Sequence, residues 1–66
     1  MVTLHDIRVG IQQLQMSQKI VLSMFYLENL NLSEISSVLD VSKGTVKSKL
    51  FYAREKLKSI INNEQQ

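Results

Sequence analysis

The stretch NLSEISSVLDVSKGTVKSKLFYAREKLK, residues 31–58, decides the fold of this 66-residue chain. It predicts a short helix, a tight turn and a long helix rich in lysine. Asn31 and Glu34 have the spacing of a capping box at the start of the short helix, and Ser42 is the expected N-cap of the long one. Asp40 is expected to take the left-handed conformation that Asp tolerates. The pattern predicts a helix-turn-helix whose second helix is basic.

The long helix, predicted to end near Ile61, has three kinds of surface when its residues are placed at about 100° intervals. The stripe that we expect to be buried consists of Val46, Leu50, Ala53 and Leu57. The small residues Gly44 and Ser48 lie on the opposite ridge. One flank of this ridge carries Lys43, Lys47, Arg54 and Lys58, and the other carries Thr45, Lys49 and Lys56. Small residues allow close approach to base edges, and cations on both flanks can reach the two phosphate rows of a DNA groove.

The charge of the chain is concentrated in this helix. The chain has a formal net charge of +2, but residues 41–61 carry six cations and one carboxylate. Residues 31–40 carry two carboxylates and no cation. This asymmetry indicates a polyanionic partner. A solvated lysine-rich face is the alternative interpretation, and the angular pattern favours DNA.

In a DNA-binding helix of this kind, the first two turns discriminate bases, through Lys43, Thr45, Lys47 and Ser48. Ser42 opens the helix, whose first backbone amides can meet a phosphate. Phe51 and Tyr52 project near the exposed side. For these two rings we expect partial burial against a neighbouring helix, rather than stacking on nucleic acid or contact with a partner.

Two more helices are predicted upstream. The first has an apolar stripe, a cap at Thr3 with Asp6 three residues later, and an end near Gln15. The second should begin at a Ser17 cap and run to about Asn29. Its apolar residues cover nearly the whole circumference, and the stripe expected in the core is Ile20, Met24 and Leu27. Neighbouring helices or another protein must cover the rest. The residues expected to bind a partner are Ile20, Val21, Leu22, Phe25 and Tyr26.

The composition excludes several classes of function. The chain has no cysteine and one histidine, and its carboxylates are scattered, so we expect no catalytic site, metal or cofactor. No apolar run is long enough for a membrane span and no signal peptide is recognisable, so a cytoplasmic protein is expected. The predicted fold is therefore an all-α, four-helix domain over residues 1–61, followed by a frayed tail at 62–66.

Residues 14–61 resemble region 4 of bacterial sigma factors, most closely the extracytoplasmic-function type. The resemblance depends on the segments 14–17, 18–30 and 31–39, on VSKGTVKSKL at 41–50 and on AREKL at 53–57. This chain departs from the family pattern at three positions. Asp40 stands where Gly is common, Lys49 where Arg is common, and Phe51 where His or Arg is common. Replacement of Arg by Lys weakens a bidentate contact.

The resemblance implies that the domain reads the −35 element of a promoter in the major groove and is held by the flap of the RNA polymerase β subunit. The implied base contacts are Lys43, Gly44, Thr45, Lys47 and Ser48. The implied backbone contacts are Asn31, Ser33, Lys49 and Arg54. The apolar surface of the first two helices would meet the flap, and an anti-sigma factor or a separate region 2-type protein are further partners to consider.

The chain has no room for the part of a sigma factor that opens the −10 element. We therefore expect either a fragment or a stand-alone region 4 protein. Two alternatives stay open at this point. One is a small LuxR-type regulator that dimerises on a palindrome, and the other is a protein-interaction module that an anti-sigma factor binds.

Overall fold

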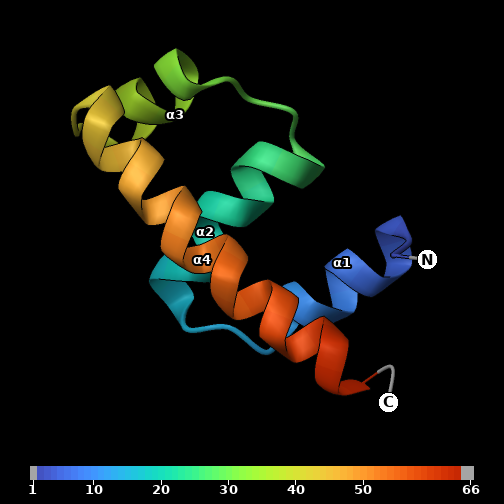
Figure 1. The fold of residues 1–66 in the computed structure, drawn as a ribbon. Helices are drawn as coiled ribbons and strands as arrows, with labels where there is room; N and C mark the ends of the chain where they lie inside the picture. The colour runs from blue at the N-terminus through green and yellow to red at the C-terminus, as the bar shows by residue number, and fades with distance from the viewer. Residues whose placement is uncertain (1, 65–66) are drawn as a thin grey trace.

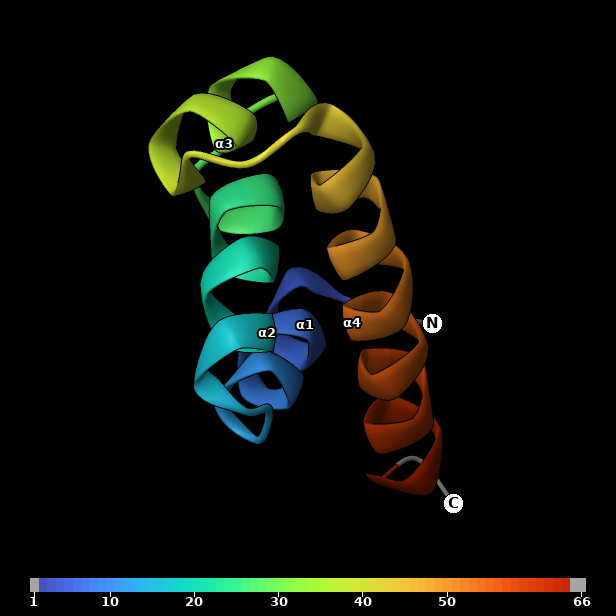
Figure 2. The same ribbon diagram turned by 90° about the vertical axis from the view of Figure 1, so that its left-hand side faces the viewer.

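The computed structural model describes residues 2–64, and all the regular structure in that range is helical. The helices are α1 (Leu4–Gln12), α2 (Met16–Leu22), η1 (Ser23–Leu27), α3 (Leu32–Leu39) and α4 (Lys43–Glu64). The π-helix η1 follows α2 directly, so the two form one rod. Figures 1 and 2 show α4 along the whole length of the molecule, with α3 beside its first turns and α1 beside its last. The predicted all-α fold with a C-terminal helix-turn-helix is confirmed.

The core forms where α1, α2 and α3 pack against a single face of α4. The predicted stripe is confirmed, because Val46, Leu50, Ala53 and Leu57 are all buried. Ile61 continues the same stripe by one more turn. The remaining buried apolar residues among those described are Ile11, Leu14, Val21, Leu22 and Ile35. One face of α4 thus holds the other helices, and the opposite face is left to solvent.

Side-chain caps begin three of the helices, as the sequence predicts. The hydroxyl of Thr3 accepts from the backbone N–H of Asp6 at 3.2 Å, and the Asp6 carboxylate accepts from the Thr3 N–H at 3.0 Å. Asn31 and Glu34 form the same reciprocal box at the start of α3. At the start of α4, the Ser42 hydroxyl accepts from the Thr45 N–H at 3.1 Å. These bonds satisfy N–H groups that have no partner within the helix.

The turn between α3 and α4 has the predicted left-handed residue. Asp40 has φ 57° and ψ 47°. The backbone N–H of Val41 then donates to the carbonyl of Ser36 at 3.1 Å, and the Ser36 hydroxyl donates back to the carbonyl of Val41. These bonds close the end of α3 and fix the direction in which α4 leaves the turn.

The boundaries of the upstream helices differ from the prediction. α1 ends at Gln12, three residues before the expected end, and buried Leu14 lies in the connection to α2. Ser17 was predicted to cap the second helix, and this is wrong, because α2 begins at Met16. Gln15 occupies the N-cap position without a side-chain hydrogen bond, and its carbonyl accepts from the Lys19 N–H at 2.8 Å.

The rod of α2 and η1 ends at Leu27, two residues before the predicted end. The N–H of Leu30 donates to the carbonyl of Met24 at 3.0 Å, and Asn29 has a positive φ of 58°. At the other end of the molecule, α4 passes the predicted end at Ile61 and continues to Glu64. The predicted tail is therefore helical over 62–64, and residues 65–66 lie outside the described part of the chain.

The core face of α2 also differs from the prediction. Ile20 is 40% exposed, and Met24 and Leu27 are only partly buried. Val21 and Leu22 are buried instead. A helix that is apolar on all sides has no periodicity to mark its inner face, so packing against α1 and α4 selects it.

Gly10 marks the closest approach of α1 to α4. A Cβ at this position would lie 2.5 Å from Cδ1 of Leu57 and 3.4 Å from Cγ1 of Ile61. Glycine lowers helix propensity by about 1 kcal/mol relative to alanine. Here it also lets the two helices touch.

Candidate nucleic-acid interface

The first turns of α4 present the predicted ridge to solvent. All five residues predicted to contact bases are exposed: Lys43, Gly44, Thr45, Lys47 and Ser48. An added Cβ at Gly44 would meet only the Ser42 hydroxyl, at 3.9 Å, so the ridge is open above this residue. The structure therefore brings the predicted base contacts together on one accessible surface.

The two flanks of α4 face different neighbours. Lys47 borders a hollow that Phe25, Leu32 and Arg54 also line. Lys49 lies on the other side of the helix, near Ser17. It borders two hollows there. One is also lined by α2 and Tyr52, and the other by α2 and the end of α3. The cations of α4 thus lie on both sides of the ridge, as the helical angles indicate.

The hydroxyls of Ser42 and Thr45 are tied to each other at the start of α4, with 3.0 Å between the two oxygens. Ser42 also caps the helix, so both side chains are positioned before any ligand arrives. Asn31, the N-cap of α3, and Ser33 in its first turn are exposed. The amide oxygen of Asn31 accepts from the Glu34 N–H at 2.8 Å, so the Asn31 NH₂ is the group that can donate to a phosphate.

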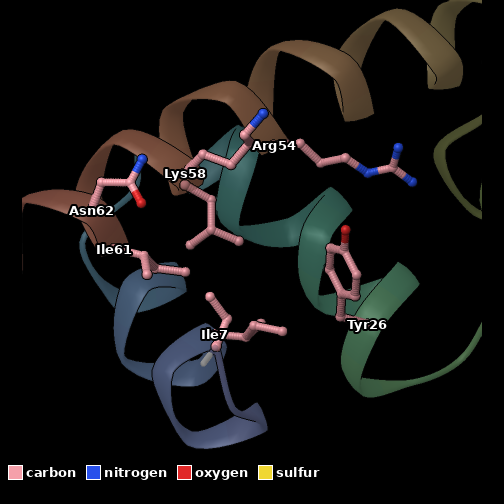
Figure 3. A pocket seen from close by; sticks show the side chains of 8 residues that line it. Ile7, Tyr26, Arg54, Lys58, Ile61 and Asn62 are labelled. Carbon is pink, nitrogen blue, oxygen red and sulfur yellow. The ribbon is translucent and has the colours of Figure 1, made fainter. Parts of the chain in front are cut away.

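Arg54 has a different environment from the lysines. Its guanidinium carbon lies 5.0 Å from the centre of the Phe25 ring and 6.0 Å from that of Tyr26. Both distances lie within the range of cation–π attraction. Figure 3 shows the Arg54 side chain extended above Tyr26. Arg54 therefore links α4 to η1, a role that the sequence analysis did not anticipate.

Residues 10–59 match the family described as Sigma-70, region 4. The chain belongs to this family. The match begins at Gly10 in α1 and ends in the last part of α4, so it includes the whole helix-turn-helix. Region 4 is a DNA-binding, non-catalytic domain of sigma factors, which agrees with the predicted absence of an active site.

A curated relative is the ECF RNA polymerase sigma factor SigM of Bacillus subtilis strain 168. The identity is 42% over 41 residues, which cover 62% of this chain and 25% of the relative. The chain thus spans about a quarter of the length of that sigma factor. No solved structure matches the chain.

The prediction of the apolar residues that bind a partner is wrong for two of the five. Val21 and Leu22 are only 1% and 0% exposed, so they belong to the core and cannot contact another protein. They are covered by the helices around α2. Ile20 is exposed, and Phe25 and Tyr26 are half-buried. These three residues are the accessible part of the predicted set.

A cavity of about 190 Å³ lies between α1, η1 and α4 of the region 4 domain. Figure 3 shows Ile7 and Ile61 on one side of it and Tyr26 on another, with Arg54 and Lys58 above. The lining residues are Val2, Ile7, Tyr26, Arg54, Leu57, Lys58, Ile61 and Asn62. The cavity is therefore apolar inside and cationic at its rim. It depends on the separation of three helices, so no local motif marks it in the sequence.

The prediction for Phe51 and Tyr52 is wrong. They are 59% and 67% exposed, and Tyr52 borders a shallow hollow that residues of α2 also line. Their rings contact each other edge to face, with 5.3 Å between the ring centres and an angle of 83°. The buried stripe of α4 lies on the opposite side of the helix, so both rings are left largely exposed.

Two kinds of feature are absent from the described residues. Within 2–64, there is no cluster of three or more His, Asp or Glu side chains that could hold a metal ion. No helix in the described range has the length and apolar character needed to cross a membrane.

Proposed function

We propose that this domain binds promoter DNA with α4 in the major groove and reads a −35-type element for transcription initiation. The observation that carries the proposal is the ridge of small residues on α4, which is exposed and has cations on both flanks. A ridge of this kind lets the helix backbone approach base edges while its flanks meet phosphates. Membership of the region 4 family supports the same function.

In this proposal, base discrimination belongs to Lys43, Gly44, Thr45, Lys47 and Ser48. Lysine can donate to guanine O6 and N7, serine and threonine can bond to several base edges, and Gly44 leaves room for the approach. The backbone contacts are Ser42 and Lys49, before and on α4, together with Asn31 and Ser33, before and on α3. Arg54 can join them only if its guanidinium leaves the rings of η1 or bridges them to a phosphate.

We also propose that the domain docks on RNA polymerase through the flap of the β subunit. The accessible residues for this contact are Ile20, Phe25 and Tyr26. The apolar cavity between α1, η1 and α4 supports the idea, because it offers space for an apolar side chain of a partner. An anti-sigma factor or a separate region 2-type protein could use the same face.

The DNA proposal is tested by the double variant Lys47→Ala plus Ser48→Ala. Fluorescence anisotropy would compare binding to a promoter duplex with binding to a scrambled duplex of the same composition. The preference for the promoter should disappear in this variant, because each good base contact contributes about 1–3 kcal/mol of discrimination. Lys56→Ala plus Ser59→Ala is the matched control, since it removes the same groups further along α4 and should keep the preference. Unchanged discrimination in the first variant would refute the proposal.

The polymerase proposal needs a separate test. Capture of the β subunit by the immobilised domain should weaken in Ile20→Ser and Phe25→Ser and should survive in the Lys47 and Ser48 double variant. Val38→Ser is the control, because Val38 is an exposed apolar residue of α3. Absence of capture at low salt, or equal weakening by the control, would contradict this part of the proposal.

A further inference from the structure

The cavity between α1, η1 and α4 combines an apolar interior with a positively charged rim. Its interior is formed by the side chains of Ile7, Leu57, Ile61 and Tyr26. Figure 3 shows Arg54 and Lys58 above this interior. None of the described residues that line the cavity carries a carboxylate. The charge at the rim therefore favours an anionic group on whatever enters.

The volume of the cavity limits the size of its occupant. The space measures about 190 Å³. An apolar cavity of about 150 Å³ is large enough to hold a benzene molecule, whereas pockets for drug-sized ligands measure about 300–1,000 Å³. The apolar body of the occupant is therefore close in size to one phenyl ring. Removal of such a group from water favours its binding.

The two cations at the rim suit a carboxylate. The guanidinium carbon of Arg54 lies 5.0 Å from the ring centre of Phe25 and 6.0 Å from that of Tyr26, so this side chain is held beside the cavity before a ligand arrives. Attraction to an aromatic ring leaves guanidinium N–H groups able to donate to a carboxylate, which can accept two of them side by side. Lys58 forms only an exposed pair with Glu55, which costs little to exchange for a ligand.

We propose that this cavity binds a small monocarboxylic acid whose apolar body is the size of a phenyl ring. The apolar body lies between Ile7, Tyr26 and Ile61, and the carboxylate lies at Arg54 and Lys58. A free acid supplies the ring and the charge in one molecule, as the cavity and its rim require. This inference goes beyond the proposed function, because it needs neither DNA nor polymerase.

One consequence of the inference rests on the proposed docking on polymerase. An acid in the cavity occupies the space that was proposed for an apolar side chain of the β subunit. Saturation with the acid should therefore weaken capture of the β subunit by the immobilised domain.

NMR titration of the ¹⁵N-labelled 66-residue chain with 3-phenylpropionate at pH 7 tests the ligand site. Amide shifts should saturate, with a Kd of about 0.1–1 mM for a ligand of this size. They should lie in α1, η1 and the second half of α4, and α3 should be unaffected. The neutral alcohol 3-phenylpropan-1-ol has the same apolar body. It should bind about threefold to tenfold more weakly, because it loses two exposed charge contacts.

Variants separate the contributions of the rim and the interior. Arg54→Gln plus Lys58→Gln should remove the preference for the acid over the alcohol. Lys19→Gln plus Lys56→Gln is the matched control, since it removes the same charge from residues that do not line the cavity and should keep the preference. Ile7→Phe should weaken both ligands more than tenfold, because its larger side chain fills the interior. Circular dichroism checks that each variant is folded, and the comparison of acid and alcohol on the wild type needs no variant.

The outcomes distinguish this inference from the proposed function. Equal affinities of acid and alcohol, shifts that do not saturate, or equal loss of preference in the Lys19 and Lys56 control would each overturn the ligand site. If the acid does not bind and the β subunit is still captured, this inference fails and the docking proposal stands. If the acid binds and capture is unchanged at saturation, the ligand site stands and the cavity is not the docking point.

Discussion

Arg54 is the residue whose surroundings differ most from the expectation. Its guanidinium over Phe25 and Tyr26 connects α4 to η1. Arg54→Ala should lower the free energy of unfolding by about 1 kcal/mol, because it removes a cation–π contact and the packing of the side-chain stem. Urea unfolding followed by circular dichroism measures this change.

Lys58→Ala is the control for Arg54, since Lys58 is an exposed cation of the same flank. Its ammonium pairs with the Glu55 carboxylate at 3.5 Å, and both side chains of that pair are largely exposed. An exposed pair of this kind contributes little to stability. Equal stability losses in the two variants would show that the rings of η1 do not hold Arg54.

Asp6 makes a pH-dependent contribution at the start of α1. The backbone N–H of Thr3 donates to this carboxylate and lowers its pKa below the usual value of 3.8. The contribution to stability is therefore present above pH 3.8 and is lost as the pH falls through the lowered pKa of the folded state. The difference in Tm between wild type and Asp6→Asn should narrow or reverse between about pH 5 and pH 2. A difference that does not depend on pH would contradict this assignment.

The sequence predicted those residue conformations that depend on near neighbours. The two capping boxes, the Ser42 cap and the left-handed Asp40 each need only a few adjacent residues, and all four are present. Burial was predicted less well. Val21, Leu22, Phe51 and Tyr52 were misplaced, because whether a side chain is covered depends on which helices lie opposite it.

At the scale of helices, the two glycines have opposite roles. Gly10 lies where α1 touches α4, and Gly44 lies on the open ridge. Gly10→Val should lower the free energy of unfolding by about 1–3 kcal/mol, because its side chain would overlap Leu57. Gly44→Val should leave stability nearly unchanged and weaken DNA binding, because its side chain would hold the ridge away from base edges.

Thermal unfolding and DNA affinity, measured on both glycine variants, check this pair of expectations. The two variants share the same chemical change, so any difference reflects position alone. A Gly44→Val domain that binds promoter DNA as wild type does would mean that the ridge does not approach bases closely.

Helix identity was easier to predict than helix length. The periodicity of apolar residues in α4 predicted its buried stripe correctly, because the other side of that helix is polar. The α2 and η1 rod lacks such a contrast, and its change to a π-helix at Ser23 alters the spacing of residues on each face. The start of α2 at Met16 was missed because its N-cap residue makes no side-chain bond.

At the scale of the whole molecule, the charge distribution predicts how salt affects binding. Six cations lie between residues 41 and 61, and those on the flanks of α4 can meet both phosphate rows. With about five phosphate contacts, the logarithm of affinity should fall against the logarithm of salt concentration with a slope of about −4 to −5. Anisotropy titrations at several salt concentrations give this slope.

Single substitutions give the salt experiment its control. Lys49→Ala should reduce the slope by about one unit, because one phosphate contact is lost. Arg8→Ala removes an exposed cation of α1 and should leave the slope unchanged. A slope near zero in the wild type would contradict a phosphate-based mode of binding.

Sedimentation of the chain should show a monomer, whereas a LuxR-type regulator should dimerise.

The central claim is that the outer face of α4 enters duplex DNA, and NMR spectroscopy of the ¹⁵N-labelled chain tests it most directly. During titration with a promoter duplex, the account predicts that the largest amide shifts occur over residues 42–52, with weaker changes at the start of α3 and little change in α1. Shifts concentrated in α1 and η1, with residues 42–52 unaffected, would contradict it.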